Sequence, residues 1–221
     1  MSIKSIIEET LVSLDGRAGL VAVSKTYPAE SIQEAYDMGQ RVFGESRPQE
    51  MAAKYEALPK DIEWRMIGHL QRNKVRLIAP FVSMIESVDS SRLVEAINSE
   101  AARCGRVIDC LLEIHVAQEE SKTGWNYEEL KEYITEGGFD GLKNIRVRGV
   151  MGIASNTDDE ERVRGDFERL AQCREELAGY FTPCFDTLSM GMSDDFLLAV
   201  ECGSTSVRIG SKIFGARKYI K

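Results

Sequence analysis

Residues 20–45 read LVAVSKTYPAESIQEAYDMGQRVFGE and contain the unit that decides the fold. The apolar run at 20–23 predicts a strand buried on both faces, as in parallel sheets. The next segment has helical periodicity, with Pro28 at its start and Gly39 at its end, the usual asymmetry of a helix. Another strand is expected at 41–46. This order predicts two parallel strands joined by a crossover helix.

The same alternation continues along the whole chain. Strands are expected at eight segments: 20–25, 41–46, 63–68, 84–89, 108–116, 147–153, 187–191 and 206–211. Because no linker, internal repeat or low-complexity segment interrupts the alternation, it predicts an α/β fold, a single (β/α)8 TIM-type barrel of residues 1–221. A doubly wound open sheet is the alternative, but the G-x-G-x-x-G turn of a dinucleotide-binding sheet is missing.

The composition argues against several classes of protein. The 221 residues are 43% apolar and 29% charged, which is typical of a soluble globular protein. Acidic residues outnumber basic ones by 36 to 28, so a nucleic-acid footprint is not expected. No stretch approaches the roughly 18 consecutive apolar residues of a membrane span, and Glu8 and Glu9 interrupt the N-terminal segment, which is not a signal peptide. We therefore expect a cytoplasmic protein that binds neither nucleic acid nor membrane.

The cysteines and histidines predict neither disulfides nor a metal site. The five cysteines are odd in number and show no C-x-x-C spacing: Cys104, Cys110, Cys173, Cys184 and Cys202. Reduced, mostly buried thiols are expected. Since the only histidines are His69 and His115, a zinc site is not expected.

Lys25 is the first candidate for chemistry. It ends the first apolar run, at the C-terminal end of the expected strand, where barrels of this type carry their sites. A lysine in partly desolvated surroundings loses some preference for its charged form, so its amine can attack an aldehyde. A lysine at a strand end can equally extend into solvent. Position alone leaves both interpretations open.

The last two expected strands end in LSMGMS (188–193) and GSTSVRIGS (203–211). Loops after the seventh and eighth strands of such barrels frequently bind phosphate. Ser193 and Ser211 offer hydroxyl donors, and Gly210 lets the backbone approach closely. Ser193 is also expected to begin a helix, whose free N–H groups favour an anion. Each loop alone could be a simple turn, but the two together, opposite the lysine of the first strand, predict a phosphate site.

Two other expected strands end in polar residues. His69 follows the third strand, where a lone histidine is more often a hydrogen-bonded structural residue than a functional one. Ser46 follows the second strand, within Gly44-Glu45-Ser46-Arg47, which by itself predicts little.

Five segments together resemble a known family. They are VAVSKTYP (21–28), GESRPQE (44–50), IGHLQRNK (67–74), LSMGMSDDF (188–196) and GSTSVRIGSKIFG (203–215). In this order and spacing, over about 20–219, the chain resembles the pyridoxal phosphate homeostasis proteins. These are single-domain relatives of the N-terminal barrel of alanine racemase, so the resemblance implies that fold.

The resemblance implies a cofactor and the residues that hold it. Lys25 would carry pyridoxal 5′-phosphate (PLP) as a Schiff base. Ser193, Gly210 and Ser211 would hold the phosphate, and Arg208 would face the pyridine nitrogen.

It further implies that Met190 and His69 line the pocket near the cofactor. Ser46 stands where the family usually has asparagine. It is shorter and has one donor fewer, and its expected place is near the ring.

The function implied is intracellular PLP homeostasis, meaning that the protein buffers the cofactor or delivers it to PLP-dependent apo-enzymes, without established catalysis. Arg208 can only donate hydrogen bonds, so it would keep the ring nitrogen unprotonated and weaken the ring as an electron sink. Racemases of this fold work with such an arginine, but take their second base from a separate β-domain, for which this chain, ending at Lys221, has no room. We therefore expect a protein that is not an enzyme.

Two other classes of function stay open. One is a small PLP-dependent amino-acid racemase or lyase with His69 or a tyrosine as base. The other is a Schiff-base aldolase, in which Lys25 attacks a sugar-phosphate carbonyl and the same loops hold the phosphate. The sequence does not fix the oligomeric state, and a monomer is compatible with it.

Overall fold

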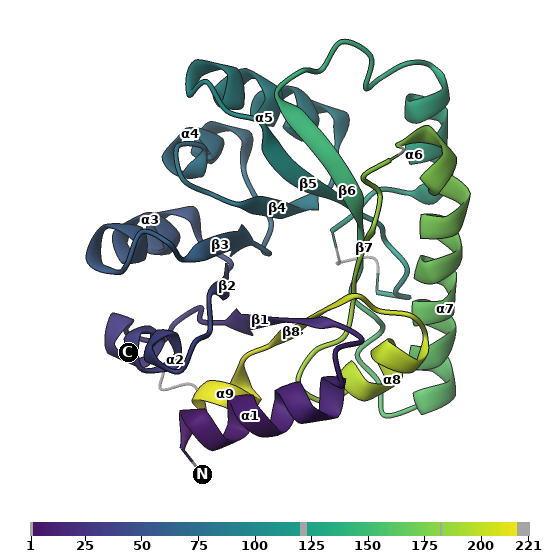
Figure 1. Cartoon of the computed structure of the whole chain (residues 1–221). Coiled ribbons are helices and arrows are strands. Elements are labelled where there is room, and N and C mark those ends of the chain that lie inside the picture. The colour runs from purple at the N-terminus through teal and green to yellow at the C-terminus, as the bar shows by residue number, and fades with distance from the viewer. Residues whose placement is uncertain (1, 120–122, 182, 216–221) are drawn as a thin grey trace.

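The structure, a computed structural model, describes residues 2–119, 123–181 and 183–215. Its centre is a closed barrel of parallel strands in sequential order, with helices around it (Figure 1). The strands are β1 (Gly19–Val23), β2 (Val42–Glu45), β3 (Glu63–Met66), β4 (Met84–Val88), β5 (Ile108–Glu113), β6 (Ile145–Met151), β7 (Thr187–Ser189) and β8 (Ser206–Ile209). The predicted (β/α)8 barrel is confirmed.

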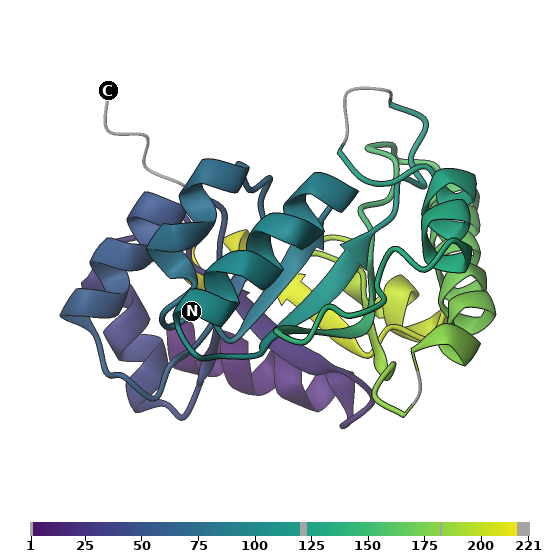
Figure 2. The ribbon, with the colours of Figure 1, turned by 90° about the horizontal axis from the view of Figure 1, so that it is seen from above.

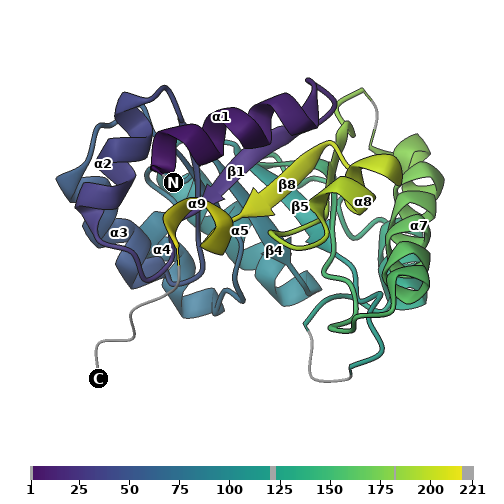
Figure 3. The same cartoon turned by 90° about the horizontal axis from the view of Figure 1, so that it is seen from below.

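The helices lie outside the barrel. They are α1 (Ile3–Leu14), α2 (Ala29–Asp37), α3 (Pro48–Ala57), α4 (Val75–Ile78), α5 (Ser91–Arg103), α6 (Tyr127–Thr135), α7 (Glu160–Leu177), α8 (Phe196–Glu201) and α9 (Ser211–Phe214), with 3-10 turns η1 (Arg72–Lys74) and η2 (Ala178–Tyr180). Seen from above, α6 and α7 stand together on one side of the strands (Figure 2). The extra helix α1 packs against α9 where the barrel closes between β1 and β8 (Figure 3).

Local sequence signals set several helix ends. Helix α2 begins after Pro28 and ends before Gly39, which has φ 97°. The side chain of Asn126 caps α6 by accepting hydrogen bonds from the amides of Glu128 and Glu129. The ends of α2 agree with the sequence-based prediction.

The start of α8 differs from its prediction. The helix begins at Phe196, whereas the sequence favoured a start at Ser193. The side chain of Asp195 accepts a hydrogen bond from the Met192 amide at 2.5 Å, which closes the preceding residues into a turn. Ser193 therefore lies in this turn, and its predicted place at a helix N-terminus is wrong.

Side chains alternate between the two faces of each strand, so the barrel has an outer and an inner side. The main hydrophobic core lies between strands and helices and includes the fully buried Trp64, Phe43 and Phe167. A second, small apolar cluster contains Met84 and Leu111. The described residues include no helix long and apolar enough to cross a membrane.

Candidate functional site

The C-terminal ends of the parallel strands meet at one end of the barrel, the mouth. Lys25 lies in a turn two residues after β1 and is half-buried. Ser46 follows β2 directly, and His69 lies three residues after β3. Because parallel strands run in the same direction, the barrel brings these residues to one end, where (β/α)8 proteins carry their sites.

Arg208 projects from β8 into the interior of the barrel. Only 4% of its surface is exposed. Its Nη1 donates to the Ser189 carbonyl at 2.8 Å and to the Ser189 hydroxyl at 2.6 Å, while Nη2 donates to the Gly152 carbonyl at 2.8 Å. Burial lowers the pKa of Arg208, and the negative charges of Glu86 and Glu113 act in the opposite direction. The guanidinium is therefore held rigidly between β8, β7 and the end of β6.

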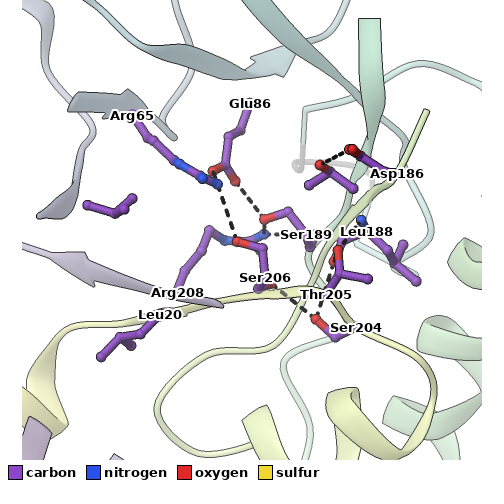
Figure 4. Close-up of polar contacts among 12 residues, drawn as sticks. Leu20, Arg65, Glu86, Asp186, Leu188, Ser189, Ser204, Thr205, Ser206 and Arg208 are labelled. Carbon is purple, nitrogen blue, oxygen red and sulfur yellow. Dashed lines mark hydrogen bonds and ion pairs between the residues drawn. The ribbon is translucent and has the colours of Figure 1, made fainter. Parts of the chain in front are cut away.

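A chain of hydrogen bonds continues from Arg208 across the barrel (Figure 4). The Ser189 hydroxyl donates to Glu86 Oε2 at 2.6 Å, and Arg65 Nη1 donates to Glu86 Oε1 at 3.2 Å. Arg65 Nη1 also lies 3.4 Å from the Ser206 hydroxyl. Glu86 is fully buried. This carboxylate thus pairs directly with Arg65 and, through the Ser189 hydroxyl, with Arg208, and it offsets part of their charge.

The two predicted phosphate loops lie against each other. The Gly210 amide donates to the Ser193 hydroxyl at 3.4 Å, and the Ser211 hydroxyl donates to the same oxygen at 3.2 Å. A Cβ atom at Gly210 would lie 3.0 Å from the Val23 carbonyl oxygen, so the loop runs against the end of β1, two residues before Lys25. Two hydroxyls and an amide therefore cluster beside the lysine's strand, as an anion site requires.

His69 lies at the rim of the mouth. Its side chain is 56% exposed, and Nδ1 lies 2.9 Å from Asp89 Oδ2. Ser46 is half-buried and packs against the backbone before His69, because a Cβ at Gly68 would lie 2.6 Å from Ser46 Cβ. Both residues are close to each other at the ends of β2 and β3.

Met190 has a different environment from the one expected. Its side chain is fully buried in the main hydrophobic core, together with Leu188. Ser189 between them projects to the interior and bonds to Arg208. Alternation along β7 therefore turns Met190 away from the interior, and the structure does not bring this side chain to the other predicted residues.

Glu113 is a site residue that the sequence reasoning did not find. It ends β5 and is 4% exposed. Its Oε1 accepts a hydrogen bond from Thr123 Oγ1 at 2.8 Å, and its Oε2 has no partner among the described residues. Both residues line a cavity of about 180 Å³ that also includes His115 and Ile153. A charged residue directly after the apolar run 110–112 is the signal that could have identified it.

Glu86, Arg65 and Ser189 were also missed. Glu86 stands inside β4, whose other residues are mostly apolar, and a charge in a strand buried on both faces needs a buried partner such as Arg65. That signal was available in the sequence. The described residues contain no group of three or more His, Cys, Asp or Glu side chains that could hold a metal ion.

The residues present fit a phosphorylated aldehyde with a ring nitrogen. Lys25 supplies a primary amine, and the Ser193, Gly210 and Ser211 cluster supplies donors for an anion. Arg208 supplies a cation that only donates hydrogen bonds.

Comparisons with known proteins agree with this arrangement. Residues 7–218 match the model of the alanine racemase N-terminal domain. The pyridoxal phosphate homeostasis protein of Aquifex aeolicus is 43% identical over 206 residues, which is 91% of this chain and 88% of the relative. PipY of Synechococcus elongatus, solved with PLP bound, is 33% identical with a TM-score of 0.88, covering 97% of this chain and all of that one.

A more distant likeness concerns the fold alone. Alanine racemase of Bartonella henselae is 14% identical with a TM-score of 0.70 and covers all of this chain but 62% of its own length. This barrel therefore corresponds in fold to about three fifths of that enzyme.

Proposed function

The chain belongs to the alanine racemase N-terminal domain family, and from this premise we propose that it binds PLP through Lys25 and takes part in PLP homeostasis. The observation that carries the proposal is the placement of three features on the neighbouring strands β7, β8 and β1. These are Lys25, Arg208 and the cluster of Ser193, Gly210 and Ser211. The PLP-bound structure of PipY, at 33% identity, supports it.

The chain's residues have separate roles in this proposal. PLP, when bound, supplies an aldehyde that an amine can capture and a ring that can withdraw electrons. Lys25 Nζ, as a neutral amine, attacks the aldehyde carbon and forms a C=N bond, while the aldehyde oxygen leaves as water with the two amine protons. Ser193, Gly210 and Ser211 donate hydrogen bonds to the phosphate. Arg208 donates to the pyridine nitrogen and so disfavours its protonation.

These roles suit a carrier better than a catalyst. A ring nitrogen that is not protonated is a weaker electron sink, so the ring stabilises negative charge on a bound amino acid less. The bond to Lys25 is reversible, since water or another amine can displace the lysine. The protein can therefore store PLP and release it, with PLP-dependent apo-enzymes as the recipients.

The absorption spectrum of the purified protein with and without added PLP tests this function. A visible band is expected on addition of PLP, and borohydride reduction should fix the cofactor to the peptide that contains Lys25. Lys25→Ala should abolish the band, while residual non-covalent binding persists through the phosphate contacts. Label on Lys74 or Lys212 instead would show that the site is wrongly assigned.

A further inference from the structure

The backbone on both sides of Lys25 is held by one turn of helix α3, from outside the barrel. On one side, the Ser24 carbonyl accepts a hydrogen bond from Lys54 Nζ at 2.8 Å. On the other, the Thr26 amide donates to Glu50 Oε1 at 2.6 Å. Lys54 and Glu50 are four residues apart on α3 and lie 2.7 Å from each other. Both peptide units that flank Lys25 are thus tied to the same ion pair.

The ion pair is part of a buried cluster. Lys54 Nζ also lies 2.7 Å from Glu45 Oε1, which accepts a further hydrogen bond from the Ser24 hydroxyl at 2.6 Å. The side chains of Lys54 and Glu45 are 8% and 0% exposed. Buried ion pairs add little stability compared with apolar side chains of the same size, because desolvation offsets their attraction. Stability alone is therefore a weak reason for such a cluster behind Lys25.

The turn that the cluster holds has an unfavourable conformation. Thr26 has φ 70°, in the left-handed region, where a β-branched residue is a genuine outlier. The other non-glycine residue with positive φ in the described ranges is Asp15, a type that tolerates this conformation better. Backbone outliers of this kind persist where surrounding contacts enforce them, and they gather at functional sites. Here the Thr26 amide is held by its hydrogen bond to Glu50, and the turn is closed by a hydrogen bond from the Tyr27 amide to the Ser24 carbonyl.

We propose that Glu50, Lys54 and Glu45 are positioning residues, which hold the turn at Ser24–Thr26 so that the Lys25 amine meets the aldehyde of PLP. The inference rests on the proposed function of Lys25. None of the three needs to touch the cofactor. A reacting group displaced by about 1 Å can lose up to about 10²-fold in rate, so control of the lysine's backbone bears directly on its reaction.

The test compares two ligands that differ in the aldehyde. PLP can bond to Lys25, whereas pyridoxine 5′-phosphate has an alcohol in place of the aldehyde and binds only through ring and phosphate contacts. Glu50→Ala should lower PLP affinity and the rate at which the visible band appears by about tenfold. Affinity for pyridoxine 5′-phosphate should stay within about twofold. Amide hydrogen exchange at Thr26 should become faster in the same variant.

Three further variants complete the experiment. Glu50→Gln keeps an acceptor oxygen and should restore most of the PLP affinity. Glu56→Ala removes an exposed carboxylate of the same helix, paired with Lys60, and should behave as wild type. Because loss of Lys54 alone would leave Glu45 buried and unpaired, the cluster is removed as Lys54→Met with Glu45→Gln, and folding is checked by urea unfolding.

The outcomes separate the inference from the function on which it rests. If Glu50→Ala lowers the affinities for PLP and for pyridoxine 5′-phosphate equally, the cluster only maintains the fold, and the positioning role is wrong. If the wild type shows the PLP band and Glu50→Ala leaves its affinity and rate unchanged, the inference alone fails. A wild-type protein without a PLP band overturns the proposed function and the inference with it.

Discussion

Arg208 places a charged guanidinium inside a barrel, where an uncompensated charge is costly. This cost is offset because the guanidinium donates hydrogen bonds to two carbonyls and to the Ser189 hydroxyl. The Ser189 hydroxyl in turn donates to the buried Glu86. With so many contacts fixed in advance, the guanidinium loses little freedom when it donates to a ligand. At the scale of single residues, the site is thus organised before a cofactor arrives.

The proposed phosphate donors, Ser193 and Ser211, lead to a prediction at the same scale. Pyridoxal, which lacks the phosphate, should bind far more weakly than PLP. Since a hydrogen bond to a charged group contributes roughly 1.5–3 kcal/mol, Ser193→Ala and Ser211→Ala should each weaken PLP affinity by about 10- to 100-fold. Titrations of the visible band measure this, with the exposed Ser99→Ala as control. Equal affinity for pyridoxal and PLP would show that the two loops are only turns.

Glu113 leads to a prediction about pH. Burial raises the pKa of this carboxyl; the Thr123 hydrogen bond lowers it, Asp89 raises it, and Arg208 and His69 lower it. Because the folded-state pKa lies above the ordinary 4.5, the carboxyl's contribution to stability is full below that pH and declines as pH rises through the folded value.

Glu113→Gln should remove this decline. The amide can still accept the Thr123 hydrogen bond, so the variant and wild type should be similar at low pH, with the variant increasingly the more stable above pH 4.5. Urea unfolding across a pH series measures the difference. An exposed carboxylate, Glu34, provides the control variant Glu34→Gln. A variant that is less stable at neutral pH would show that the ionised carboxylate has a stabilising partner.

At the scale of elements, Gly149 in β6 leaves the least room for a side chain among the described glycines. The register between β5 and β6 shifts between Cys110 and Leu111, so that Leu111 pairs with Gly149. Gly149 has φ 155°, and a Cβ atom there would lie 1.7 Å from the Thr187 carbonyl oxygen of β7. An irregularity in one pair of strands therefore brings the backbone of β6 directly against its other neighbour.

Two glycine-to-alanine variants compare this crowded position with an open one. Gly149→Ala should destabilise the protein by more than about 3 kcal/mol, because backbone must move to admit the methyl group. Gly165→Ala, on the exposed face of α7 with nothing within 4 Å, should stabilise it by about 0.5–1 kcal/mol. Urea unfolding of both variants is the measurement. Equal effects of the two would mean that β6 tolerates a side chain at position 149.

At the scale of the whole molecule, the barrel brings the proposed PLP-binding residues to one end. Lys25, the phosphate loops and His69 all follow the C-terminal ends of strands. Outside the barrel, α3 reaches this end through its contacts with Ser24 and Thr26. A helix can thus influence the mouth without lining it.

We predict that the 221-residue chain loaded with PLP has no substantial racemase activity. Racemisation ordinarily needs bases on both faces of the bound amino acid, and Lys25, in its proposed role, would serve one face. The two candidates for the base on the opposite face, Tyr27 and His69, are unfavourably placed. Tyr27 donates its hydroxyl hydrogen to the Gly215 carbonyl and packs on Phe214, and His69 is exposed and held by Asp89.

Incubation with L-alanine and other L-amino acids, followed by chiral chromatography, measures the D-enantiomer formed. The expected rate is far below the enzymatic range of roughly 1–10³ s⁻¹. A rate within that range that disappears in Lys25→Ala would identify the protein as an amino-acid racemase.

The sequence alone determined the architecture, and it predicted where the candidate site residues of the loops lie. Alternating apolar runs and helical segments are local patterns, so they predicted the barrel without knowledge of which strands pair. The position of Lys25 after its strand predicted an end-of-barrel residue, and the paired Gly/Ser loops predicted the cluster of Ser193, Gly210 and Ser211.

Only the tertiary structure decided which side chains contact one another. Contacts between Arg208, Ser189 and Glu86 join strands that are far apart in sequence, and barrel closure sets which of them meet. The direction of Met190 depends on which face of β7 turns inward, since alternation defines two faces but does not say which is the interior. The hydrogen bonds from α3 to the backbone beside Lys25 likewise depend on how a helix packs on a closed barrel. No local sequence pattern encodes that packing.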